Sequence, residues 1–147
     1  MKFENYMVLE FPSRSSNEGF ARSAVACFAA QMDPTLEELG DIRTAISEAV
    51  TNCIVHAYKN GLGVIYISVK IFDNGQVIIK IRDKGCGIEN VNQAMEPLYT
   101  TGGAERAGLG FAVMQSFMDN IKVISKIDKG TTITLTKNII PRVAKNG

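Results

Sequence analysis

The spacing of apolar and polar residues divides the chain into recognisable strands and helices. Residues 6–11 alternate in polarity before a proline, which predicts a first strand. Apolar residues then recur at every fourth position from Phe20 to Met32, through Ala24 and Phe28, which predicts an amphipathic helix with this stripe in the core. A second helix is predicted over residues 36–58, with Thr35 and Glu38 forming a capping box at its start, or with Asp33 and Pro34 as an alternative start.

Two β-hairpins are predicted in the rest of the chain. Residues 64–72 and 76–82 are rich in β-branched side chains and flank an Asp-Asn-Gly turn. Residues 121–127 and 131–137 repeat this pattern around Asp-Lys-Gly, and a helix over residues 110–119 is predicted between the hairpins. Strands joined by tight turns are antiparallel. The order β-α-α-β-β-α-β-β therefore predicts an α+β fold, a two-layer sandwich whose mixed, mostly antiparallel sheet carries the helices on one face.

Length and charge restrict the class of protein. The 147 residues fit one domain, which we assign to residues 1–140, followed by a C-terminal tail at 141–147. Lys and Arg number 16 and Asp and Glu 15, so the basic excess of a nucleic-acid-binding protein is missing. No apolar run reaches the ~18 residues of a transmembrane helix, and the N-terminus lacks a secretion-signal pattern. Three cysteines match no zinc spacing, so we expect buried or half-buried thiols in a cytoplasmic protein; they are Cys27, Cys53 and Cys86.

Six of the 13 glycines fall between residues 85 and 110, which indicates backbone that bends sharply or closely approaches another group. Asp83 ends a predicted strand and precedes Gly85 and Gly87, so a carboxylate acceptor lies beside backbone that can approach a flat ligand. An ordinary turn is the alternative. Gly108 and Gly110 are expected to open a helix whose N-terminal N–H groups favour phosphate, with a flexible loop as the alternative.

A narrow polar stripe crosses the second predicted helix. Thr44, Glu48, Asn52 and His56 follow one another at four-residue intervals between apolar positions. A solvated helix face is the ordinary explanation of such a stripe. A carboxylate and an amide held over an apolar surface can also hold a hydrated cation or activate a nucleophile, which makes Glu48 and Asn52 candidates for chemistry.

Four motifs, in this order and spacing, resemble those of the GHKL family of ATP-binding domains, which share the Bergerat ATP-binding fold. The motifs are Glu48-x-x-x-Asn52, Asp83-x-Gly85-x-Gly87, Gly108-x-Gly110 and Gly130-Thr131-Thr132. Within that family, residues 47–52, 81–83, 97–101 and 130–133 resemble the anti-sigma factor serine kinases, above all those of sporulation. The resemblance covers nearly the whole chain and implies a single ATP-binding kinase domain.

The resemblance implies a role for each matching residue. Glu48 would be the catalytic general base, and Asn52 would bind the nucleotide through a Mg²⁺ ion whose other ligands are phosphates and waters. Asp83 would accept a hydrogen bond from the adenine amino group. Gly85 and Gly87 would let the backbone approach the base.

The resemblance also implies contacts at the rest of the nucleotide. Thr132 would support the adenine contact, and residues 90–107 would form a lid. Arg106 would reach either a phosphate or a partner. The remaining nucleotide-binding positions implied for the lid and the phosphate cradle are Thr100, Thr101, Gly108, Leu109 and Gly110.

The function implied by the resemblance is that of an anti-sigma factor that is also an ATP- and Mg²⁺-dependent protein serine/threonine kinase. It would bind and inhibit a sporulation sigma factor, phosphorylate a serine of an anti-anti-sigma factor and form a homodimer. The exposed side of the first helix, including Arg22, is a candidate docking surface. We expect no direct nucleic-acid or membrane partner. The alternatives are a kinase of a stress-response sigma factor, a histidine-kinase-like ATPase module and a module that binds ATP without transferring phosphate. The single histidine, His56, lies inside the proposed ATP-site helix, which argues against the histidine-kinase-like module.

Overall fold

The computed structural model describes residues 2–96 and 103–140. The elements in chain order are β1 (Phe3–Pro12), α1 (Asn17–Ala29), a short 3-10 helix (Ala30–Met32), α2 (Leu36–Asn52), a π-helical turn (Cys53–Ala57), β2 (Val64–Phe72), β3 (Gln76–Asp83), α3 (Val91–Ala94), α4 (Gly103–Phe117), β4 (Asn120–Lys126) and β5 (Gly130–Asn138). The predicted order is confirmed, with the short α3 added. The predicted tail at residues 141–147 lies outside the described residues.

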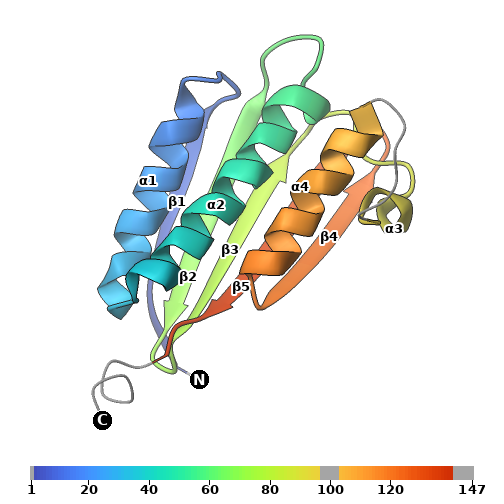
Figure 1. Ribbon diagram of the computed structural model, residues 1–147. Helices are drawn as coiled ribbons and strands as arrows, with labels where there is room; N and C mark the ends of the chain where they lie inside the picture. The colour runs from blue at the N-terminus through green and yellow to red at the C-terminus, as the bar shows by residue number, and fades with distance from the viewer. Residues whose placement is uncertain (1, 97–102, 141–147) are drawn as a thin grey trace.

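The strands form a five-stranded sheet in the order β1-β2-β3-β5-β4. All four pairings are antiparallel, where the sequence predicted a mostly antiparallel sheet. Helices α1, α2 and α4 lie side by side on one face of this sheet (Figure 1). The predicted two-layer α+β sandwich and both hairpins are therefore confirmed. Among the described residues, no helix is both long and apolar enough to cross a bilayer.

The hydrophobic core fills the space between the sheet and the helices. Strand residues at alternate positions point inward, and helix residues three or four apart line the facing side. Their burial removes apolar surface from water, which stabilises the fold by roughly 1.5–3 kcal/mol for each large aliphatic side chain. The largest fully buried side chains are Ile42, Ile46, Val50, Ile65, Ile67, Ile71, Ile79, Ile81, Phe111, Met114 and Leu135, with Val25 from α1.

The core-facing side of α1 differs from the predicted stripe. Its fully buried residues are Ala21, Val25 and Ala29, one position after the expected series. Phe20 is 53% exposed and contacts the Phe11 ring edge-on, with the centroids 6.2 Å apart. Small side chains on the inner stripe let α1 pack closely against its neighbours, while the larger ring stays at the rim. The prediction chose the larger apolar residues of two overlapping four-residue series and was wrong by one position.

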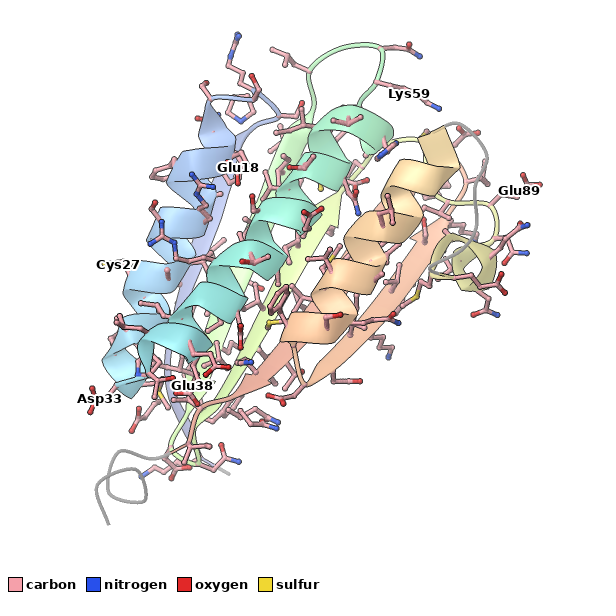
Figure 2. All side chains as sticks on the ribbon, in the orientation of Figure 1. Glu18, Cys27, Asp33, Glu38, Lys59 and Glu89 are labelled. Atoms are coloured by element: carbon pink, nitrogen blue, oxygen red, sulfur yellow. The ribbon has the colours of Figure 1, made fainter. Side chains whose placement is uncertain are left out.

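The one-position shift of the buried stripe on α1 also explains why the Cys27 thiol is exposed. Cys27 is exposed, on the outer side of α1 (Figure 2), whereas Cys53 is buried and Cys86 is half-buried. The expectation of a buried or half-buried thiol was therefore wrong for Cys27 and is confirmed for the other two.

Helix α2 begins as predicted and ends differently. The Thr35 hydroxyl accepts a hydrogen bond from the Glu38 N–H at 3.1 Å, and the Glu38 carboxylate accepts one from the Thr35 N–H at 2.8 Å, which confirms the capping box. The single long helix predicted to residue 58 gives way after Asn52 to the π-helical turn Cys53–Ala57. Turns of this kind are rare and occur frequently at functional sites, so the end of α2 is a candidate position for a functional site.

Candidate functional site

A cavity of about 360 Å³ opens where the end of α2, the end of β3 and the start of β5 meet. This volume lies within the range of small-molecule pockets. Its walls are mainly apolar, and Phe111 of α4 and Ile133 of β5 contribute to them. Lys59, at the mouth, follows the π-helical turn (Figure 2). The polar groups that line it are few, and all except Lys59 come from the predicted motifs, the polar stripe of α2 or their immediate neighbours.

Asp83 is the buried carboxylate of this cavity, with 5% of its surface exposed. Its Oδ1 accepts hydrogen bonds from the N–H groups of Gly85 at 2.9 Å and Thr131 at 3.2 Å. Its Oδ2 accepts a weak one from the Cys53 thiol at 3.6 Å. Burial raises the pKa of Asp83, and these three hydrogen bonds partly oppose the rise. The carboxylate keeps spare acceptor capacity on Oδ2, which suits the amino group of a flat ligand.

The Cys53 thiol is held in its donor form. Burial raises the pKa of Cys53 well above the ordinary value, and the neighbouring Asp83 charge raises it further. The thiol therefore stays protonated at neutral pH and can keep donating to Asp83. Cys53 was not among the predicted site residues, because a cysteine within an apolar helix face has the sequence signature of an ordinary core residue.

The glycines after Asp83 are required by close contacts within the protein. A Cβ on Gly85 would lie 2.4 Å from the Ala57 carbonyl oxygen. Gly87 has φ +77°, and a Cβ there would lie 2.2 Å from the Lys126 carbonyl oxygen. These glycines therefore meet the backbone of the π-helical turn and of β4, and their approach to a flat ligand stays a prediction. Of the two glycines, Gly87 lines the cavity.

Glu48 and Asn52 lie one turn apart on α2, and α4 packs closely beside them. A Cβ on Gly110 would lie 3.2 Å from Asn52 Oδ1 and 3.3 Å from Glu48 Oε2. The absence of a side chain at this position therefore leaves room beside the two polar groups. Asn52 Nδ2 is buried without a hydrogen-bond partner, which costs about 1–3 kcal/mol unless a ligand meets it. Asn52 also lines the cavity, so its amide faces the same space as Asp83.

The geometry fits one protein ligand for a hard cation. An amide oxygen is an oxygen donor of the kind Mg²⁺ prefers, and Mg²⁺ usually keeps several waters or phosphate oxygens as its other ligands. Asn52 supplies such an oxygen beside open space. Among the described residues, no three His, Cys, Asp or Glu side chains gather closely enough to form a metal site of their own.

The expected start of the phosphate-binding helix was wrong. Helix α4 begins at Gly103, so Gly108 and Gly110 lie inside it. Only the first four N–H groups of an α-helix are free of intrahelical bonds, and these two glycines come later. The prediction treated Gly108-x-Gly110 as a helix start because glycine disfavours helix interiors. The close approach of α2 explains why glycine is nevertheless present at residue 110.

Other predicted positions fall into three groups. Thr132 does not line the cavity, since its side chain alternates with the inward-facing Thr131 and Ile133, which do. Leu109 is 53% exposed on α4. The structure does not describe Thr100 and Thr101 or the side chain of Arg106. The inward series of β5 was readable from the sequence, because Ile133 and Leu135 identify the buried face and Thr131 belongs to it.

Tyr58 is a further residue that the sequence did not single out. Its hydroxyl accepts a hydrogen bond from the Lys84 N–H at 2.6 Å and donates one to the Val64 carbonyl at 2.7 Å. It thereby joins the end of the π-helical turn to the start of β2 and to the residue after Asp83. We infer that Tyr58 fixes the position of the Asp83 backbone at the edge of the cavity.

The sheet covered by helices on one face, the strand-end carboxylate and the helical Glu–Asn pair define a nucleotide-binding domain of the GHKL type. A family model described as the histidine kinase-like ATPase domain matches residues 11–137. A protein of Caldanaerobacter subterraneus named anti-sigma F factor is 56% identical over 140 residues, which cover 95% of this chain and 97% of the relative. Proteins of the same name from Clostridium acetobutylicum and Priestia megaterium are 54% and 51% identical, over 91% and 92% of this chain and 94% of each relative. The chain therefore belongs to the anti-sigma F factor family of histidine kinase-like ATPase domains.

Solved structures agree on the fold. The RsbU and RsbW domains of a Mycobacterium tuberculosis protein match with a TM-score of 0.68 at 18% identity, over 92% of this chain and 32% of that one. A blue-light activated histidine kinase of Erythrobacter litoralis matches with a TM-score of 0.58 at 19% identity, over 84% of this chain and 41% of that one. The predicted fold class and the predicted family are both confirmed.

Proposed function

We propose that this protein is an anti-sigma factor that binds and inhibits a sporulation sigma factor and, as an ATP-dependent serine kinase, phosphorylates an anti-anti-sigma factor. The observation that carries the proposal is the continuity of the site. The cavity with Asp83 reaches the Glu48 and Asn52 pair through Asn52, within a family whose members are named anti-sigma F factor.

Adenine binds in the apolar cavity in this proposal. Its amino group donates to Asp83 Oδ2, while Oδ1 stays bound to the N–H groups of Gly85 and Thr131. Thr131 takes the supporting position that was predicted for Thr132, because Thr131 is on the inner face. The cavity wall at Gly87 and Phe111 accepts the flat faces of the base.

The phosphates extend from the cavity toward Asn52 and α4. Asn52 would hold the Mg²⁺ ion, which neutralises charge on the transferring phosphoryl group when it is bound. Gly110 keeps the position beside the Glu48 carboxylate free of a side chain, since a Cβ there would lie 3.3 Å from Glu48 Oε2. Thr100, Thr101, Arg106, Gly108 and Leu109 remain proposed contacts of the phosphates and the lid.

Glu48 acts as the general base. Its carboxylate takes the proton of the partner's serine hydroxyl while the serine oxygen bonds to the γ-phosphorus. The bond from that phosphorus to the β,γ-bridging oxygen breaks, and ADP leaves with its electron pair. Most of the rate then comes from positioning and charge neutralisation, as in other phosphoryl transfers.

The partner's serine would enter from the α1–α2 side. A hollow there is lined by Arg22, Thr44, Ser47 and Glu48, so the proposed base faces both this hollow and the phosphate space. The Arg22 guanidinium lies 3.5 Å from Glu18, and its Nε is buried without a hydrogen-bond partner. A polar group of the docked protein would satisfy this Nε atom.

We also propose a homodimer acting in the cytoplasm.

The direct test incubates the protein with labelled ATP, Mg²⁺ and an anti-anti-sigma protein. Phosphoserine on the partner is the expected product. Glu48→Ala should retain ATP binding and lose transfer, whereas Glu37→Ala, an exposed acidic position in the first turn of the same helix, should leave both unchanged. Unchanged transfer by Glu48→Ala would remove Glu48 as the base, and label on His56 would favour a histidine-kinase-like reaction.

A further inference from the structure

The sheet has a second face that the described helices leave open. Helices α1, α2 and α4 lie together on the other side (Figure 1). Side chains alternate between the two faces along each strand, and the inward set forms the core. In β3, for example, Val77, Ile79 and Ile81 are buried, while Lys80 and Arg82 are exposed. The outward set is therefore available for contact with another molecule.

This open face concentrates basic charge. Its exposed basic side chains come from β2, β3, β4 and the residue after β3, and they are Lys70, Lys80, Arg82, Lys84, Lys122 and Lys126. Glu10 is the acidic residue at an outward position in the paired registers of the described strands. Because the whole chain has a net charge of +1, the rest of the molecule is net negative. The near-neutral net charge of the chain therefore combines a basic open face with a net negative remainder.

The register places these cations as neighbours. Ser68, Lys80, Thr134 and Lys122 form one continuous row across β2, β3, β5 and β4. Adjacent strands lie about 4.8 Å apart, so Lys80 and Lys122 are separated by roughly 10 Å. That spacing is close to the Debye length of about 10 Å at 0.1 M salt, so their fields reinforce each other at a docked anion.

We infer that this open face binds an acidic segment of a protein partner. The basic side chains supply the charge complementarity. Exposed apolar side chains flank them, with Val8 62% exposed on β1 and Ile124 59% exposed on β4. Complementary charge of this kind steers a protein partner to the surface and orients it there.

A single-stranded nucleic acid is a poorer fit to the same face. Such ligands rely on stacking of bases on exposed aromatic rings. The central ring, Tyr66, is covered by the Arg82 guanidinium at 4.5 Å and the Lys84 ammonium at 5.2 Å. The exposed rings of Phe3 and Tyr6 belong to the edge strand β1, away from the row that holds Lys80 and Lys122. No residue of the basic set lines the nucleotide cavity, so this docking surface and the kinase site can succeed or fail independently.

The test uses fluorescence anisotropy with a labelled peptide of alternating glutamate and leucine and a labelled oligothymidylate of equal charge. The double variant Lys80→Glu, Lys122→Glu should weaken peptide binding about tenfold, since it replaces two attractions by two repulsions. The matched control reverses two exposed basic residues outside the basic set, Lys2→Glu and Arg14→Glu, and should change the affinity less than about twofold. Raising the salt to about 1 M should abolish peptide binding.

Folding is checked by unchanged ATP binding in both variants, and the neutral pair Lys80→Ser, Lys122→Ser should give a smaller loss. Equal loss in the control variant would overturn the proposal, because bulk charge alone would explain it. Tighter binding of oligothymidylate than of the peptide would assign the face to nucleic acid. A sedimentation shift caused by the face variants would assign it to a second copy of the chain.

Discussion

Replacing Asp83 by asparagine tests the adenine site with almost no change in shape. The new amide side chain can keep its oxygen toward the N–H groups of Gly85 and Thr131, which lie 2.9 and 3.2 Å from Asp83 Oδ1. Its NH₂ group then stands where Oδ2 accepts from the Cys53 thiol and faces the cavity. A donor replaces an acceptor opposite the adenine amino group.

The expected loss of ATP affinity follows from that single exchange. A hydrogen bond to a charged group contributes about 1.5–3 kcal/mol, and an unpaired buried donor costs a similar amount. We expect ATP binding to weaken by about 1–3 kcal/mol, which corresponds to roughly 5- to 150-fold in Kd. GTP, which presents an oxygen acceptor at the same position of the base, should lose less affinity than ATP.

The thermal stability of nucleotide-free Asp83→Asn should be retained or rise at pH 7, although its ATP affinity falls. Since the folded-state pKa of Asp83 is raised, the folded protein holds this proton more tightly than the unfolded chain. Stability therefore falls as pH rises from the ordinary aspartate pKa through the raised one, and above that window the ionised carboxylate is a constant cost. Asparagine carries no charge, so the nucleotide-free variant should be at least as thermally stable as the parent at pH 7, with its advantage vanishing in acid.

Isothermal titration calorimetry with ATP and GTP measures the change in nucleotide affinity. Thermal unfolding without nucleotide from about pH 3 to pH 8 measures the change in stability. Asp128→Asn is the matched control, because Asp128 is exposed in the β4–β5 turn at φ +61°, which asparagine tolerates. Equal ATP affinity in Asp83→Asn and the parent would refute the adenine assignment. A large loss of nucleotide-free stability at pH 7 would refute the electrostatic reasoning.

Three further changes separate stability from activity. Gly110→Ala should reduce phosphotransfer at least tenfold, because its Cβ enters the space beside Glu48, while thermal stability changes little, since alanine favours the helix by about 1 kcal/mol. Lys137→Met removes a 2.9 Å ion pair with Asp41 and should lower the free energy of unfolding by about 1–3 kcal/mol in urea, with ATP affinity retained. Tyr58→Phe loses both hydroxyl hydrogen bonds and should weaken ATP binding about threefold to tenfold in calorimetry.

Local patterns predicted the elements well. The Asp-Asn-Gly turn and alternating β-branched residues located β2 and β3, because both signals act over a few residues. The Thr35 and Glu38 pair predicted the start of α2 for the same reason. The family resemblance predicted one site for Glu48, Asn52 and Asp83. In the structure Asn52 and Asp83 line one cavity, and Glu48 lies one helical turn from Asn52.

Predictions that depended on tertiary contacts were weaker. Gly110 was expected near the start of a helix, yet it lies inside α4, and glycine is present there because α2 passes so close. The inner stripe of α1 was predicted to include Phe20, which is exposed. The sequence does not show where the sheet ends, and so it does not show which side of α1 the sheet covers. The Cys53 contact with Asp83 joins residues 30 positions apart and has no local signal.

The π-helical turn Cys53–Ala57 sets a limit on how this sequence can vary in length. The Tyr58 N–H bonds to the Cys53 carbonyl five residues back, where an α-helix would bond four residues back, so losing one residue here would remove this closure and rotate Tyr58 out of place. Tyr58 would leave both Val64 and Lys84, and the cavity would lose one wall. The exposed residues 59–62 that follow lie in a connection where length changes are absorbed without such rotation. Insertions and deletions in functional homologues should therefore accumulate after Tyr58 and be excluded from the turn before it.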